Sequence, residues 1–263
     1  MPEYYLLDPT GNITILADMP DNPEDRLRLP DIARGLMELE PDAEQTGFIG
    51  GGDDLCEISL SMAGGEFCGN ATMSAAAVYC MDMPEGEERT LSVRVSGSKR
   101  PVGVKIKKKD ASSFEGTVRM PDAVSVTEER LEYEDRIYSY PVVGFEGISH
   151  IICTEPVERE FAEKAIRKWC SDLGADALGI MQIDESAGSL LPLVFVRAAD
   201  TLFWESSCAS GTTAAGVFFA RKYGRTVDMS FAEPAGNLAV RADTDGSAFL
   251  TGSVRIIKKP ASV

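Results

Sequence analysis

The chain repeats itself, and this internal repeat limits the possible folds more than any other feature of the sequence. At a shift of 136 residues, the segment around Tyr4 matches the segment around Tyr140, and GTVR at 116–119 matches GSVR at 252–255. A duplicated chain buries two related cores and can form a site where they meet. We therefore expect two pseudo-symmetric halves within the 263 residues.

The best local match carries a cysteine in both copies. FCGNATMSAAAVY at 67–79 corresponds to SCASGTTAAGVFF at 207–219, which sets Cys68 against Cys208 at a shift of 140 residues. The four additional residues indicate an insertion before the second cysteine. In both copies the cysteine precedes a run of small residues, which lets a surrounding sheet approach a helix closely.

The remaining segments indicate an α+β fold. Helices are expected at 29–39, 71–80, 157–173 and 211–223. Alternating apolar and polar residues predict strands in LSVRV, VGVKI, GTVRM, LPLVFVR, NLAVRA and GSVRII. We expect an N-terminal half at 1–120, joined by a returning strand at 253–263, and a C-terminal half at 121–252, with the active site in the cleft between them. The boundary is placed in MPDAVSVTEERLEYEDR, which is acidic and turn-prone.

Charge and cysteine spacing exclude several classes of protein. The 26 basic and 42 acidic side chains give a net charge of −16, which repels nucleic acids and anionic membrane surfaces. The sequence has no apolar run long enough for a membrane span and no signal-peptide pattern at its N-terminus, so we expect a cytoplasmic protein. The six cysteines form no CxxC pair and there is one histidine, so we expect no metal site and no disulfide scaffold.

A cysteine directly before a helix can serve as an acid or a base. The unpaired N–H groups of a helix N-terminus favour the thiolate and should lower the thiol pKa. The same groups bind carboxylates, so Gly69 and Asn70, together with Ala209 and Ser210, are candidates for holding an anionic substrate. The alternative for each cysteine is simple core packing, which we expect for the other four.

Two cysteines that face each other across one carbon would form a two-base racemase. One thiolate removes the α-proton of an amino acid, and the opposite thiol protonates the other face. Helix-end N–H groups stabilise the intermediate anion. No lysine adjoins a Gly-rich helix entry, so a pyridoxal cofactor is not expected.

Four short segments resemble the diaminopimelate epimerase superfamily of cofactor-independent racemases. They are MAGGEFCGN, ESSCASGTTAAG, an early GN, and GISH in place of GNPH. The resemblance implies paired halves, each a curled mixed or antiparallel sheet wrapped round a central helix, with Cys68 and Cys208 as the acid/base pair. It also implies a pocket lined by Asn12 and the four helix-start residues, and no cofactor.

The departures from this superfamily concern the distal end of the substrate. Ala199 and Asp200 stand near the usual Glu-Arg pair, so a second substrate carboxylate would lose its arginine partner. Asp200, with Gln45 or Glu44, suits a neutral or cationic side chain. This pattern is similar to the histidine racemases of the superfamily. We assign no role to His150 or Glu205.

Several alternatives stay open from the sequence. The chain could be a diaminopimelate epimerase, a non-catalytic amino-acid-binding protein, or an isomerase that shifts a double bond on the same fold. The paired cysteines disfavour the last of these, because such isomerases use an acidic residue. The partner expected is a small amino-acid substrate, and a homodimer is the one assembly considered.

Overall fold

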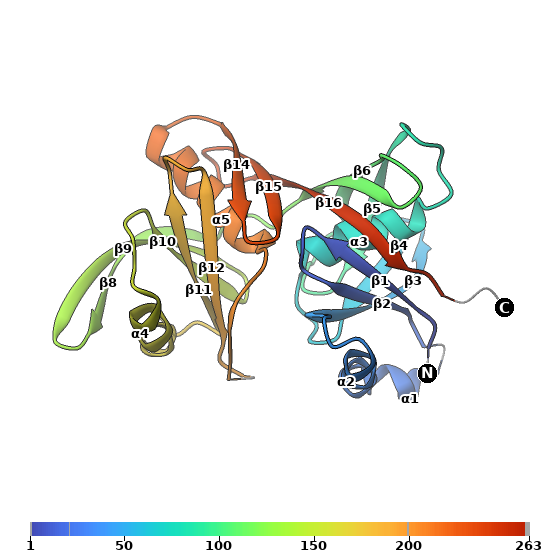
Figure 1. Cartoon of the computed structure of the whole chain (residues 1–263), viewed down its shortest axis with the longest axis horizontal. Coiled ribbons are helices and arrows are strands. Elements are labelled where there is room, and N and C mark those ends of the chain that lie inside the picture. Colours follow the sequence, from blue (N-terminus) through green and yellow to red (C-terminus); the bar gives the residue numbers. More distant parts are fainter. Residues whose placement is uncertain (1, 21, 199, 261–263) are drawn as a thin grey trace. The chain divides into compact units, whose positions relative to one another are not determined.

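The structure is a computed structural model that describes residues 2–20, 22–198 and 200–260. The chain divides into two compact units, one formed by Met1–Arg119 with Thr251–Val263 and the other by Met120–Leu250. Both units combine helices with extensive sheet (Figure 1). The predicted α+β class is confirmed.

In the first unit the sheet closes on itself. Its strands pair in the order β1-β2-β3-β4-β5-β6-β7-β16, and β1 also pairs with β16. The β2–β3 and β4–β5 pairs are parallel, and helices lie between their strands in the chain. The elements of this unit are β1 (Tyr4–Pro9), β2 (Thr14–Asp18), α1 (Pro23–Arg26), α2 (Leu29–Leu39), β3 (Gln45–Asp53), β4 (Cys56–Met62), α3 (Gly69–Tyr79), β5 (Glu88–Val95), β6 (Val102–Lys108), β7 (Ser113–Arg119) and most of β16 (Ala248–Lys258).

Helix α3 lies inside this sheet. It contacts β1, β2, β4, β5, β6 and β7, and its residues from Gly69 to Val78 are all buried. Because every side of the helix meets a strand, it needs small residues all round rather than an apolar stripe. The packing is close at Gly116 of β7, where an added Cβ would lie 2.9 Å from the Cβ of Met73.

Helix α2 packs on the sheet through one apolar face. Ala33 and Leu36 are buried against a cluster that includes Leu6, Ile15 and Phe48. The helix occupies residues 29–39, as predicted for the counterpart of the helix expected at 157–173.

In the second unit the pairing order is β16-β15-β14-β12-β11-β10-β9-β8, and β13 pairs with β12. The β10–β11 and β12–β14 pairs are parallel, again with helices between them in the chain. The elements are β8 (Ser125–Tyr133), β9 (Arg136–Phe145), β10 (Ile148–Cys153), α4 (Arg159–Asp172), β11 (Ala177–Asp184), β12 (Ser189–Val196), β13 (Thr201–Trp204), α5 (Ala209–Tyr223), β14 (Val227–Glu233) and β15 (Gly236–Ala242).

Helix α5 is the small-residue helix of this unit. It contacts β9, β10, β11, β14 and β15 and is buried along most of its length. An added Cβ on Gly216 would lie 2.6 Å from the side chain of Val240. The helix ends at Gly224, whose φ of 64° is the left-handed conformation that favours glycine at this position.

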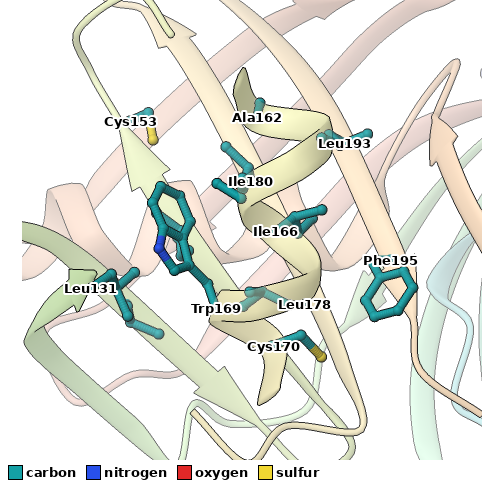
Figure 2. Packing of buried hydrophobic residues seen from close by; sticks show 13 residues of the cluster. Leu131, Cys153, Ala162, Ile166, Trp169, Cys170, Leu178, Ile180, Leu193 and Phe195 are labelled. Atoms are coloured by element: carbon teal, nitrogen blue, oxygen red, sulfur yellow. The ribbon is translucent and has the colours of Figure 1, made fainter. Parts of the chain in front are cut away.

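Helix α4 covers the other face of the β10–β12 sheet. Leu178 and Ile180 of β11 pack against Ile166 and Trp169 (Figure 2). Met181, which alternates with them, lies on the α5 face, where a Cβ on Gly211 would meet its sulfur. The Nε1 of Trp169 donates to the carbonyl of Glu132 at 3.2 Å, so its polar edge is satisfied inside the core.

The segment expected as a turn-prone boundary is largely strand. Residues 125–133 form β8, which pairs in register with β9 through a two-residue turn at Glu134 and Asp135. The expectation of a turn-prone segment was wrong because Leu131 and Tyr133 supply an apolar face, while Arg130 and Glu132, which alternate with them, are exposed.

Candidate functional site

Cys68 is the N-cap of α3. Its sulfur accepts a hydrogen bond from the backbone N–H of Ala71 at 3.4 Å. Burial nevertheless raises the pKa of the Cys68 thiol to about 11, because desolvation outweighs the helix N–H donors. The expected net lowering of this pKa is therefore wrong, and Cys68 is a thiol at neutral pH.

A chain of polar side chains connects Cys68 to the protein surface. The Cys68 Sγ donates to Gln45 Oε1 at 3.2 Å, and Gln45 Nε2 donates to Asn12 Oδ1 at 2.5 Å. Asn12 Nδ2 in turn donates to Glu44 Oε2 at 2.6 Å. Gln45 begins β3, and Asn12 lies just before β2, so two neighbouring parallel strands position the chain. The structure thus brings three predicted site residues together: Asn12, Gln45 and Cys68.

Gly69 and Asn70 are the first two residues of α3, and both are buried. Their N–H groups belong to the first turn, where helix donors have no partner within the helix. The Oδ1 atom of Asn70 is also buried and has no hydrogen-bond partner among the described residues. The start of α3 therefore offers polar atoms to a bound group.

Cys208 is the N-cap of α5 and is buried. Its backbone N–H donates to Glu233 Oε2 at 2.7 Å, and its sulfur lies 3.6 Å from Ser210 Oγ. Burial and then the charge of Glu205 raise the pKa of Cys208 well above that of a free thiol. Ala209 and Ser210 form the first turn of α5, as Gly69 and Asn70 do in α3.

His150 reaches the same group of residues from β10. Its Nε2 lies 3.0 Å from Ser210 Oγ, so Ser210 connects the imidazole to the thiol of Cys208. Burial lowers the pKa of His150 to about 3, which keeps the ring neutral. The sequence assigned it no role, and its position in a strand gave no signal of this contact.

Two glutamates complete the surroundings of Cys208. Glu233 at the end of β14 accepts from both the Cys208 N–H and the Thr212 hydroxyl, and burial raises its pKa to about 7. Glu205 is the second, and its charge raises the pKa of the Cys208 thiol. Sequence reasoning missed Glu233 because it lies 25 residues after Cys208, beyond any local motif.

Asp200 is not brought together with these residues. Its side chain is 76% exposed and forms an ion pair with Arg167 of α4. Its partner belongs to helix α4, which covers the face of the sheet opposite α5. Its role in substrate binding stays a prediction.

Each unit thus presents a buried thiol at the start of a buried helix, with polar side chains in contact with it. A thiol in this position can deliver a proton, and its thiolate can receive one. Within the described ranges, no three or more His, Cys, Asp or Glu side chains gather in a way that could hold a metal ion. Nor do these ranges contain a helix with the length and apolar character needed to span a membrane.

The chain is similar to proteins of known activity. A family model described as "Histidine racemase CntK N-terminal domain" matches residues 3–259. A histidine racemase from Fusobacterium nucleatum subsp. nucleatum is 32% identical over 262 residues, which covers 97% of this chain and 94% of that protein. One from Staphylococcus aureus is 31% identical over 251 residues and covers 90% of this chain and 87% of that protein.

Solved structures share the fold. A "predicted epimerase" from Pseudomonas aeruginosa has a TM-score of 0.70 at 14% identity and covers 100% of this chain and 99% of that one. A hydroxyproline epimerase from Agrobacterium vitis has a TM-score of 0.68 at 11% identity, with 98% and 93% coverage. At these identities the likeness concerns the fold alone.

Proposed function

Because the chain belongs to the histidine racemase family, and is therefore an isomerase of the cofactor-independent racemase and epimerase class, we propose that it interconverts L- and D-histidine. The family match over nearly the whole chain supports the substrate. The absence of the superfamily's Glu-Arg pair at Ala199 and Asp200 agrees with it, because a side chain without a second carboxylate needs no such partner.

The proposed mechanism uses Cys68 and Cys208 as the two acid/base residues. One sulfur, as thiolate, takes the α-proton, and the other, as thiol, gives its proton to the opposite face of the carbanion. The reverse reaction exchanges the two roles. The observation that carries this proposal is that each cysteine is the N-cap of a buried helix in its own unit. We also infer that the two units arose by duplication, as in diaminopimelate epimerase-like folds.

The proposed carboxylate contacts are the helix starts, Gly69 with Asn70 and Ala209 with Ser210. Backbone N–H groups at a helix N-terminus suit a carboxylate and the enediolate formed from it. The unpaired Oδ1 of Asn70 accepts hydrogen bonds, and so is suited to the α-ammonium group.

Exchange in heavy water tests the function. The protein is incubated with L-histidine in D₂O, and loss of the α-proton is followed by NMR together with loss of optical rotation. We expect both. Retention of the α-proton with every amino acid tested would favour a binding protein, and exchange only with another amino acid would replace the substrate but keep the mechanism.

Serine variants test the two cysteines. Cys68→Ser and Cys208→Ser should each reduce racemisation by about 100-fold or more, because a serine hydroxyl is a far weaker acid than a thiol. One of them can still exchange the α-proton of a single enantiomer. Cys56→Ser is the matched control, since Cys56 lies in β4 outside the site, and it should keep its activity. Near wild-type rates in both site variants would reject the assignment.

A further inference from the structure

The hydrogen bonds that lead to Cys68 have a fixed direction. Glu44 is exposed, and the oxygens of a carboxylate only accept hydrogen bonds. Asn12 must therefore turn its amide NH₂ toward Glu44, as it does at 2.6 Å, which leaves its oxygen toward Gln45. Gln45 must then give its NH₂ to Asn12, which leaves only its oxygen for Cys68.

Thr14 fixes the same direction independently. Its hydroxyl donates its one hydrogen to the carbonyl of Asn12 at 2.8 Å. Toward Gln45 Nε2, also 2.8 Å away, it can therefore act only as an acceptor. Both neighbours of the Gln45 NH₂ group are thus acceptors, and an inverted Gln45 would set its oxygen against two further oxygens.

We propose that Glu44 and Thr14 are positioning residues that favour the protonated form of Cys68, by locking the Gln45 amide with its oxygen toward the sulfur. An amide oxygen stabilises a thiol that donates to it and repels a thiolate. Before Cys68 can act as a base, Gln45 must turn over. We call this hydrogen-bonded arrangement of Gln45 the lock. Its catalytic meaning rests on the proposed role of Cys68 as an acid/base residue, but the arrangement itself belongs to the first unit alone.

Other influences on Cys68 remain constant when the lock is changed. Burial and the charge of Glu66 favour the thiol, and the N–H groups at the start of α3 favour the thiolate. None of these depends on Glu44 or Thr14. Removing the lock should therefore lower the pH at which Cys68 titrates, and it should do so only when Gln45 is present.

The experiment measures the rate of Cys68 alkylation by iodoacetamide from pH 6 to 11, with the modified peptide identified by mass spectrometry. The thiolate is the reacting form, so the profile reports the titration of Cys68. In Glu44→Gln/Thr14→Val, Gln45 can invert and donate its NH₂ to the thiolate. We expect Cys68 to react about tenfold faster at pH 8 in this variant, and less than tenfold faster in Glu44→Gln alone.

A double-mutant cycle separates the lock from loss of charge or of structure. In a Gln45→Met background, the same two substitutions should change the rate by less than about twofold. A full tenfold effect in that background, or none in the Gln45 background, would overturn the proposal. Glu38→Gln, on the exposed side of α2, removes one charge as a control and should leave the rate unchanged.

Alkylation needs no turnover, so this result is independent of racemase activity. If the double variant does not fold, Glu44→Gln remains, because this exposed side chain contributes nothing to the core. A rate increase that depends on Gln45 supports the lock even if histidine is not the substrate. Failure in the heavy-water assay, in contrast, concerns only the proposed function.

Discussion

The two cysteines occupy equivalent positions at the starts of helices but have different neighbours. Cys68 contacts a neutral amide, and the nearest carboxylate of its hydrogen-bonded chain is two side chains away. Cys208 lies beside two carboxylates, those of Glu205 and Glu233. Burial raises the pKa of both thiols, and these carboxylates add to the effect at Cys208. The repeat therefore supplies two thiols whose acidities are set by side chains that are not repeated.

Glu233 should make the stability of the protein depend on pH. Burial raises its pKa from 4.5 to about 7, so between these values the folded chain holds a proton that the unfolded chain has released. Its contribution to the free energy of unfolding is complete below pH 4.5 and is lost as the pH rises through 7. Glu233→Gln should therefore stabilise the protein at pH 8 by about 3 kcal/mol relative to its effect at pH 4.5.

Urea unfolding of both proteins at pH 4.5 and 8 measures this difference. Glu155→Gln is the control, because Glu155 is exposed and should give the same small change at both pH values. An effect of Glu233→Gln that is equal at the two pH values would mean that the carboxyl is not held protonated in the folded state.

Residues close to the cysteine motifs could be predicted from the sequence, and residues from distant strands could not. Gly69, Asn70, Ala209 and Ser210 follow the cysteines directly and do form the helix starts. Glu233 and His150 reach Cys208 and Ser210 from strands β14 and β10. Their placement depends on the strand pairing, for which a single sequence gives no local signal.

At the scale of elements, helices α2 to α5 were predictable because small residues and end signals mark them, whereas the single turn of α1 was not predicted. Strand β8 was not predicted from the sequence. Its charged residues obscure the alternation of apolar and polar residues that is typical of a strand. The turn at its end is also unusual. Glu134 and Asp135 have φ values of 47° and 58°, which glycine and asparagine adopt far more readily.

Asp135→Gly should therefore stabilise the β8–β9 hairpin. Two-residue hairpin loops with positive φ at both positions favour Asn-Gly or Asp-Gly, and relief of the left-handed strain is worth about 0.5–1 kcal/mol. Thermal unfolding of the variant should show a higher midpoint, by about 1–3 °C for a chain of this size.

Asp54→Gly is the matched control for this hairpin. Asp54 also lies in a two-residue loop, between Asp53 and Cys56, but it does not have a positive φ. Glycine there adds only flexibility to the unfolded chain and should lower the midpoint. If both substitutions shift the midpoint in the same direction, the strain assigned to Asp135 is absent.

At the scale of the whole molecule, the path of the chain joins the two units. The chain leaves the first unit after Arg119 and returns to it at Thr251, within β16. The returning segment pairs with β1 and buries Val254 and Ile256. Thr251 also hydrogen-bonds Thr117 of β7 at 2.8 Å. The first unit therefore depends on residues that follow the second unit in the chain.

Removing residues 251–263 should consequently loosen the first unit before the second. Burial of Val254 and Ile256 is worth about 1.5–3 kcal/mol each, so their loss should lower the hydrogen-exchange protection of α3 amides by about 100-fold or more. The amides of α5 should keep most of their protection, because β14 and β15 remain against that helix. Hydrogen exchange followed by mass spectrometry of peptides from both helices measures the contrast.

A chain that ends at Lys258 keeps all of β16 and should behave as the full chain does. Equal loss in α3 and α5 would mean that the two units unfold as one cooperative structure, and a larger loss in α5 would reverse the dependence inferred from the chain path.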